Sequence, residues 1–93
     1  MKRHKLTRAA ALTYDENKQI APKLSAKGAG VVAENIIKKA KEHDVPIIED
    51  PSLVELLSEL NINETIPDRL YEAVAEVFAF IYQVDKEVKR HKR

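Results

Sequence analysis

Apolar side chains recur at helical spacing in three stretches of this 93-residue chain, and this periodicity constrains the fold more than any other feature. In residues 28–43 they fall on one face, as is typical of a helix that packs against a core. These positions are Ala29, Val32, Ala33, Ile36, Ile37 and Ala40. A second helix is predicted to begin at Asp50 and Pro51, because Asp is a preferred N-cap and Pro is favoured at the first helical position. Its apolar stripe consists of Leu53, Leu56, Leu57 and Leu60.

The third helix is predicted to begin at Pro67 and to carry large apolar residues on one face. These residues are Leu70, Val74, Val77, Phe78 and Ile81. A fully buried side chain of this size contributes roughly 1.5–3 kcal/mol, so we expect them in the core. We expect the end of this helix to fray into residues 85–93, which are nearly all charged.

A hairpin is predicted ahead of the first helix. Residues 8–14 alternate between two faces, with Leu12 and Tyr14 on the same side, as in a half-buried strand. After a polar turn, residues 19–26 can return as the second strand. Because Pro22 has no amide donor, this strand should lie at an edge of the sheet or carry a bulge there.

A third short strand, buried in the sheet, is predicted at residues 45–48, Val-Pro-Ile-Ile. A strand, a helix and a strand in succession favour a right-handed crossover. The expected fold is a small α/β domain in which a mixed three- or four-stranded sheet is covered by three helices, in the order β-β-α-β-α-α. Residues 1–8 would form a basic, flexible lead-in, residues 9–85 the domain, and residues 86–93 a charged tail.

The composition excludes several classes of protein. A net charge of +1 does not suggest a general polyanion binder, and the absence of Cys excludes disulfides and thiolate metal sites. No apolar run is long enough to span a bilayer, and the basic N-terminus lacks the apolar core of a secretory signal. The positive charge gathers in residues 2–5 and 89–93, which we expect to be solvated tails.

No motif for catalysis or metal binding is found. His4, His43 and His91 lie in the two tails and at a helix end, without the spacing of metal ligands. The adjacent carboxylates at residues 15–16 and 49–50 fall in a turn and at a helix cap, so they do not suggest an acid–base pair. The sequence therefore predicts no enzyme, no metal and no cofactor.

The stretch Ala26-Lys27-Gly28 at the expected junction between strand and helix has two interpretations. The amides and the Lys27 charge could bind an anion at the start of the helix. Alternatively, Gly28 allows a tight entry into the helix, and the motif is structural. The second interpretation is favoured because the spacing of a P-loop is absent.

Three longer runs carry a resemblance to a known family: AALTYDENKQIAPKLSAKGAG, HDVPIIEDPSLVELL and IPDRLYEAVAEVFAFIYQVDK. Together they resemble the cytoplasmic C-terminal domain of the FlhB/YscU family, which are export-apparatus proteins of bacterial flagella and type III secretion systems. The resemblance covers about residues 9–85. It implies the same β-β-α-β-α-α order that the periodicity predicts.

Family members also carry a membrane domain and, just ahead of the first strand, a self-cleaving Asn-Pro-Thr-His motif. The resemblance places these four positions on His4, Lys5, Leu6 and Thr7, where neither the Asn nor the Pro is present. We therefore expect a stand-alone FlhB-like domain that does not cleave itself. The missing motif favours a natural short paralogue over a piece cut from a longer chain, and both interpretations stay open.

The resemblance implies a shallow apolar patch that receives export substrates, formed by Ala21, Pro22, Ala75 and Phe78. The implied partners are protein components of the export apparatus and export substrates, and the implied location is the cytoplasm, including the export gate at the inner face of the membrane. We expect a monomer. The alternative is a small nucleic-acid-binding protein that uses the basic tails, although we expect no nucleic acid as partner.

Overall fold

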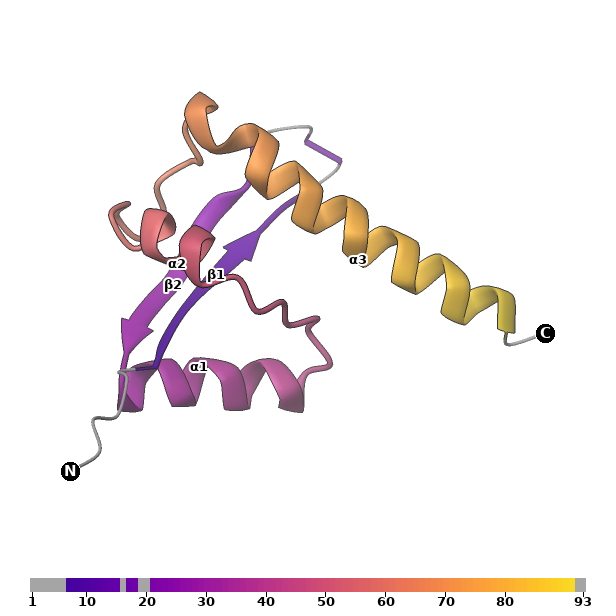
Figure 1. The fold of residues 1–93 in the computed structure, drawn as a ribbon, viewed down its shortest axis with the longest axis horizontal. Coiled ribbons are helices and arrows are strands. Elements are labelled where there is room, and N and C mark those ends of the chain that lie inside the picture. The colour runs from indigo at the N-terminus through magenta and orange to yellow at the C-terminus, as the bar shows by residue number, and fades with distance from the viewer. Residues whose placement is uncertain (1–6, 16, 19–20, 92–93) are drawn as a thin grey trace.

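Two antiparallel strands and three helices make up the fold in the computed structural model, which describes residues 7–15, 17–18 and 21–91, with side chains as far as Tyr82. In chain order the elements are β1 (Arg8–Thr13), β2 (Lys23–Ala29), α1 (Val31–Glu42), α2 (Pro51–Leu57), the 3₁₀ turn η1 (Asp68–Leu70) and α3 (Tyr71–His91) (Figure 1). Helix α1 packs against both strands, and α2 contacts β1. Helix α3 starts near one end of the strands and extends away from them (Figure 1).

A β-bulge determines which side chains of β2 share a face. The register leaves Ser25 without a paired residue on β1. Side chains alternate along a strand, and the extra residue of a bulge shifts that alternation by one. Leu24 and Lys27 consequently lie on the same face, where Leu24 enters the core and Lys27 reaches the end of α2. Gly28 lies on the opposite face, against α1.

Gly28 of β2 packs closely against the first turn of α1. A Cβ on Gly28 would lie 2.8 Å from the Cβ of Val32, so this close approach requires glycine.

Both ends of α1 depend on backbone conformation. Gly30, the N-cap, has φ 60° and ψ −128°, which also favours glycine. At the other end, Asp44 has φ 57°, and the next amide donates to the carbonyl of Ala40. This arrangement is a Schellman motif, and it ends α1.

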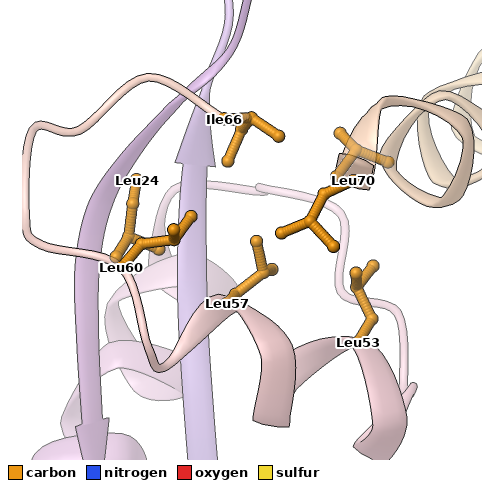
Figure 2. Packing of buried hydrophobic residues seen from close by; sticks show 7 residues of the cluster. Leu24, Leu53, Leu57, Leu60, Ile66 and Leu70 are labelled. Carbon is orange, nitrogen blue, oxygen red and sulfur yellow. The ribbon is translucent and has the colours of Figure 1, made fainter. Parts of the chain in front are cut away.

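The core lies on the face of the sheet opposite α1, where α2, η1 and the start of α3 meet. Its buried residues are Leu24, Leu53, Leu57, Leu60, Ile66, Leu70 and Val74 (Figure 2). Four partly buried residues pack around them, namely Ala10, Leu12, Val77 and Phe78. The predicted cap of α2 is confirmed, because the carboxylate of Asp50 accepts a hydrogen bond of 3.1 Å from the amide of Leu53.

The sheet is smaller than the sequence suggested, although the α/β class with three helices is confirmed. The described residues form a two-stranded sheet in place of three or four strands, so the predicted crossover is wrong. Residues 45–48 form no strand, and Val45 and Ile47 are 52% and 43% exposed. The physical reason is that the Schellman motif uses the amide of Val45 to end α1, so this amide is not available to pair with a strand. The connector before η1 adds one isolated bridge, between Lys23 and Thr65.

Two predicted boundaries near the hairpin are wrong. Strand β2 begins at Lys23 rather than at residue 19, and it continues to Ala29; residues 19–20 lie outside the described part of the chain. Helix α1 consequently begins at Val31 and not at residue 28. The strand continues through Gly28 because the residues that follow the bulge stay paired with β1, with Ala9 opposite Gly28.

Two residues of the predicted apolar stripes are more exposed than expected. Val32 is 53% exposed and Leu56 is 40% exposed, because each lies at the margin of its stripe. Pro67 does not begin an α-helix directly, since it is extended and precedes the 3₁₀ turn η1. Helix α3 then continues as far as His91, beyond the point where fraying was expected.

Candidate docking groove

An apolar groove of about 440 Å³ opens where the start of α3 passes the chain segments that flank the β1–β2 turn. We call it the α3 groove. Its lining residues are Tyr14, Ala21, Pro22, Ile66, Tyr71, Val74, Ala75 and Phe78. Tyr14 follows β1, Ala21 and Pro22 precede β2, and Ile66 lies on the connector before η1. The other four residues belong to one face of α3.

The four positions expected from the resemblance all line this groove. Ala21 and Pro22 come from the sheet side, and Ala75 and Phe78 from α3, so residues more than fifty positions apart meet in one surface. Their role in binding stays a prediction. Sequence reasoning missed Tyr14 and the other lining residues, because they were assigned to a strand face, to the core or to no site.

A spacing signal could have found part of the missing set. On α3 the lining residues Tyr71, Val74, Ala75 and Phe78 are separated by three, four and seven positions, which places them on one helical face. Ile66 could not be found in this way, because it comes from a connector whose path depends on tertiary contacts.

The floor of the groove is buried and its rim is aromatic. Ile66 and Val74 are 1% and 2% exposed, and the Ile66 amide donates a 2.8 Å hydrogen bond to the carbonyl of Pro22. At the rim, the rings of Tyr14 and Phe78 have centroids 5.7 Å apart and are tilted by 47°, an attractive geometry for aromatic pairs. Tyr14 and Tyr71 are about half exposed, so each offers an apolar ring to a ligand and a hydroxyl group to water.

The stretch Ala26-Lys27-Gly28 lies within β2 and not in a loop. The ammonium of Lys27 donates hydrogen bonds to the carbonyls of Ser58, at 3.0 Å, and Leu60, at 2.7 Å. Carbonyls at a helix C-terminus carry partial negative charge, so the Lys27 charge is already used inside the fold. The structural interpretation of this motif is therefore the better one, and Gly28 contributes through its close approach to α1.

Of the four positions matched to the self-cleavage motif, only Thr7 belongs to the described part of the chain. His4, Lys5 and Leu6 fall outside the described residues. Thr7 is exposed, and its carbonyl accepts a 2.7 Å hydrogen bond from the amide of Gly30, which fixes the chain just ahead of β1. His43 is the exposed C-cap residue of α1.

The described part of the chain holds no group of three or more His, Cys, Asp or Glu residues that could bind a metal ion. Within those same residues, no helix has the length and apolar character needed to cross a membrane.

Comparisons with known proteins give a consistent result. The model of the FlhB HrpN YscU SpaS Family matches residues 7–81. Uncharacterized protein YlqH of Bacillus subtilis is 53% identical over 87 residues, which are 94% of each chain. Flagellar biosynthetic protein FlhB of Salmonella typhimurium is 47% identical over 79 residues, covering 84% of this chain but 21% of that protein. The crystal structure of the PscU C-terminal domain superposes with a TM-score of 0.74 at 25% identity, covering 80% of this chain and 95% of that one.

Proposed function

Because the chain belongs to the FlhB HrpN YscU SpaS family, we propose that it is a protein-binding module of flagellar or type III protein export. The α3 groove carries this proposal, since it joins all four expected patch residues in one apolar surface. Its proposed ligand is a short apolar segment of an export substrate. The proposed location is the cytoplasm, at or near the export apparatus.

The shape and chemistry of the α3 groove suit such a segment. Its rim offers Tyr14 and Tyr71, which are half exposed, and its floor is closed by Ile66. A bound apolar side chain would remove these surfaces from water, which is worth about 25 cal/mol for each Å² buried. Ile66 and Val74 are already buried in the floor, so binding would not have to order these two side chains.

Within this proposal the chain does not cleave itself. The family reaction needs an Asn side chain that attacks its own carbonyl ahead of a Pro, and this chain has His4-Lys5 at the matched positions. None of its Asn residues precedes a Pro. Intact mass after prolonged incubation at mildly alkaline pH is expected to stay unchanged, and two fragments that divide near residue 4 would contradict this part of the proposal.

A pair of matched variants tests the docking site. Ala75 lines the α3 groove, and Ala73 is also exposed on the same helix but lies about 200° around it. We expect Ala75→Asp to weaken binding of substrate-derived peptides at least about tenfold, because docking would bury an unpaired carboxylate. Ala73→Asp should bind like the wild type. Fluorescence anisotropy with overlapping synthetic peptides from flagellar export substrates measures both affinities.

Two outcomes of this experiment would overturn the proposal: that no such peptide binds, or that the two variants bind equally well. Salt dependence separates the proposal from the nucleic-acid alternative. Phosphate binding weakens steeply as salt rises, whereas apolar docking changes little. An affinity for DNA or RNA that exceeds the peptide affinity and falls steeply with salt would favour the alternative.

A further inference from the structure

The connector between α2 and η1 runs alongside β2 although it forms no regular strand. The amide of Leu24 donates to the carbonyl of Glu64 at 3.0 Å, and the amide of Asn63 donates to the carbonyl of Leu24 at 2.6 Å. The Ile66 amide then reaches the carbonyl of Pro22. This path ends in the α3 groove, which Pro22 and Ile66 both line.

One side chain of β2 contacts the start of the same connector. Lys27 donates to the carbonyls of Ser58 and Leu60, just past the last turn of α2, where backbone carbonyls have no partner within the helix. Figure 2 shows the chain looping from Leu60 back to Ile66, above Leu57. Lys27 is half-buried. Because its ammonium is charged, its hydrogen bonds to backbone carbonyls are stronger than those between neutral groups.

The bulge at Ser25 is what allows Lys27 to make these contacts. In a regular strand, residues separated by three positions point to opposite faces. The extra residue places Lys27 on the same face as Leu24, where its ammonium reaches the carbonyls of Ser58 and Leu60. The bulge thus directs both the Leu24 side chain and the Lys27 ammonium toward the connector between α2 and η1.

We infer that Lys27 is a positioning residue for the α3 groove. It fixes the start of the connector to β2, so that the backbone bonds from Asn63 to Ile66 form in the correct register and Ile66 closes the groove floor. Lys27 itself does not line the α3 groove, so its effect on a bound peptide would be indirect. The inference rests on the proposed function only for the peptide; the anchoring of the connector stands apart from it.

The test compares Lys27→Met with Lys39→Met. Methionine keeps the long apolar stem and removes the ammonium, and Lys39 is an exposed residue of α1 whose loss changes the net charge equally. By NMR hydrogen exchange, the Asn63 and Ile66 amides of Lys27→Met should exchange at least about tenfold faster relative to the α1 amides. The peptide affinity of Lys27→Met, measured at a temperature well below its unfolding midpoint, should also fall. Lys39→Met should change neither the exchange rates nor the affinity.

Unchanged exchange at these two amides in Lys27→Met would overturn the inference. If the wild type binds no peptide, the proposed function fails, while the exchange data still decide whether Lys27 anchors the connector. If Lys27→Met does not fold, the ammonium spectrum of the wild type decides. A slowly exchanging Lys27 ammonium signal supports the anchor, and one that exchanges as fast as that of Lys39 contradicts it.

Discussion

Replacement of Gly28 by alanine should destabilise the domain, although alanine usually makes a helix or strand more stable than glycine does. The added Cβ would lie 2.8 Å from the Cβ of Val32 and would also meet its Cγ1. Carbon atoms pack at about 3.5–4.0 Å, so α1 and β2 must separate by about 1 Å. Such overpacking costs about 1–3 kcal/mol.

The opposing gain is smaller than this cost. Restricting the unfolded chain by Gly→Ala contributes about 0.4–1 kcal/mol of stability. The expected net loss for Gly28→Ala is therefore about 1–2 kcal/mol, seen in urea unfolding as a lower midpoint at an unchanged slope.

A double-mutant cycle with Val32→Ala tests the cause. Val32 is 53% exposed, so its truncation alone should change stability by no more than about 0.5 kcal/mol. In the Gly28→Ala background it removes Cγ1 but not Cβ, and should restore about half of the loss. A Gly28→Ala variant as stable as the wild type, or additive effects of the two substitutions, would refute the reasoning.

Three further substitutions and one matched control have expected outcomes, each measured by urea unfolding followed by circular dichroism. Asp50→Ala should cost about 1 kcal/mol, because the Leu53 amide loses its N-cap acceptor; no loss would show that the cap is not needed. Ile66→Ala should cost about 2–5 kcal/mol, whereas Ile62→Ala, at a position 52% exposed, should stay within about 0.5 kcal/mol of the wild type; equal effects would place Ile66 outside the core. Gly30→Ala should cost about 1–3 kcal/mol, because φ 60° with ψ −128° strains any residue with a Cβ, and a neutral effect would contradict this N-cap conformation.

The helices were largely predictable because each carries local signals. Asp50 and Pro51 mark the start of α2, and the apolar spacing of Leu53 and Leu57 marks its buried face. These signals lie within a few residues of one another, so they act whatever the rest of the chain does. The margins of a stripe are less certain, as Leu56 shows, because exposure there depends on how far the neighbouring element extends.

The sheet was harder to predict because pairing is a long-range property. The run at residues 45–48 has the composition of a buried strand, yet Val45 ends the preceding helix and no strand forms. The bulge at Ser25 likewise leaves no distinctive mark in the sequence, although it decides where Lys27 points. The role of Lys27 could therefore not be found from its position beside Gly28.

The site was predictable in part, and only through the family resemblance. The resemblance brought Ala21 and Pro22 together with Ala75 and Phe78, and the structure places all four in the α3 groove. Nothing in residue spacing connects the first pair with the second. Tyr14 was missed because its contact with Phe78 forms only when the chain folds, and local spacing does not indicate it.

The central claim is that the α3 groove binds an apolar segment of an export substrate. The most direct measurement is a ¹H–¹⁵N NMR titration of the whole chain with a peptide that binds in the anisotropy screen. The account predicts saturable shifts at the amides of Ala21, Ala75 and Phe78 and their neighbours. Shifts confined to the basic residues 2–5 and 89–93 would contradict it.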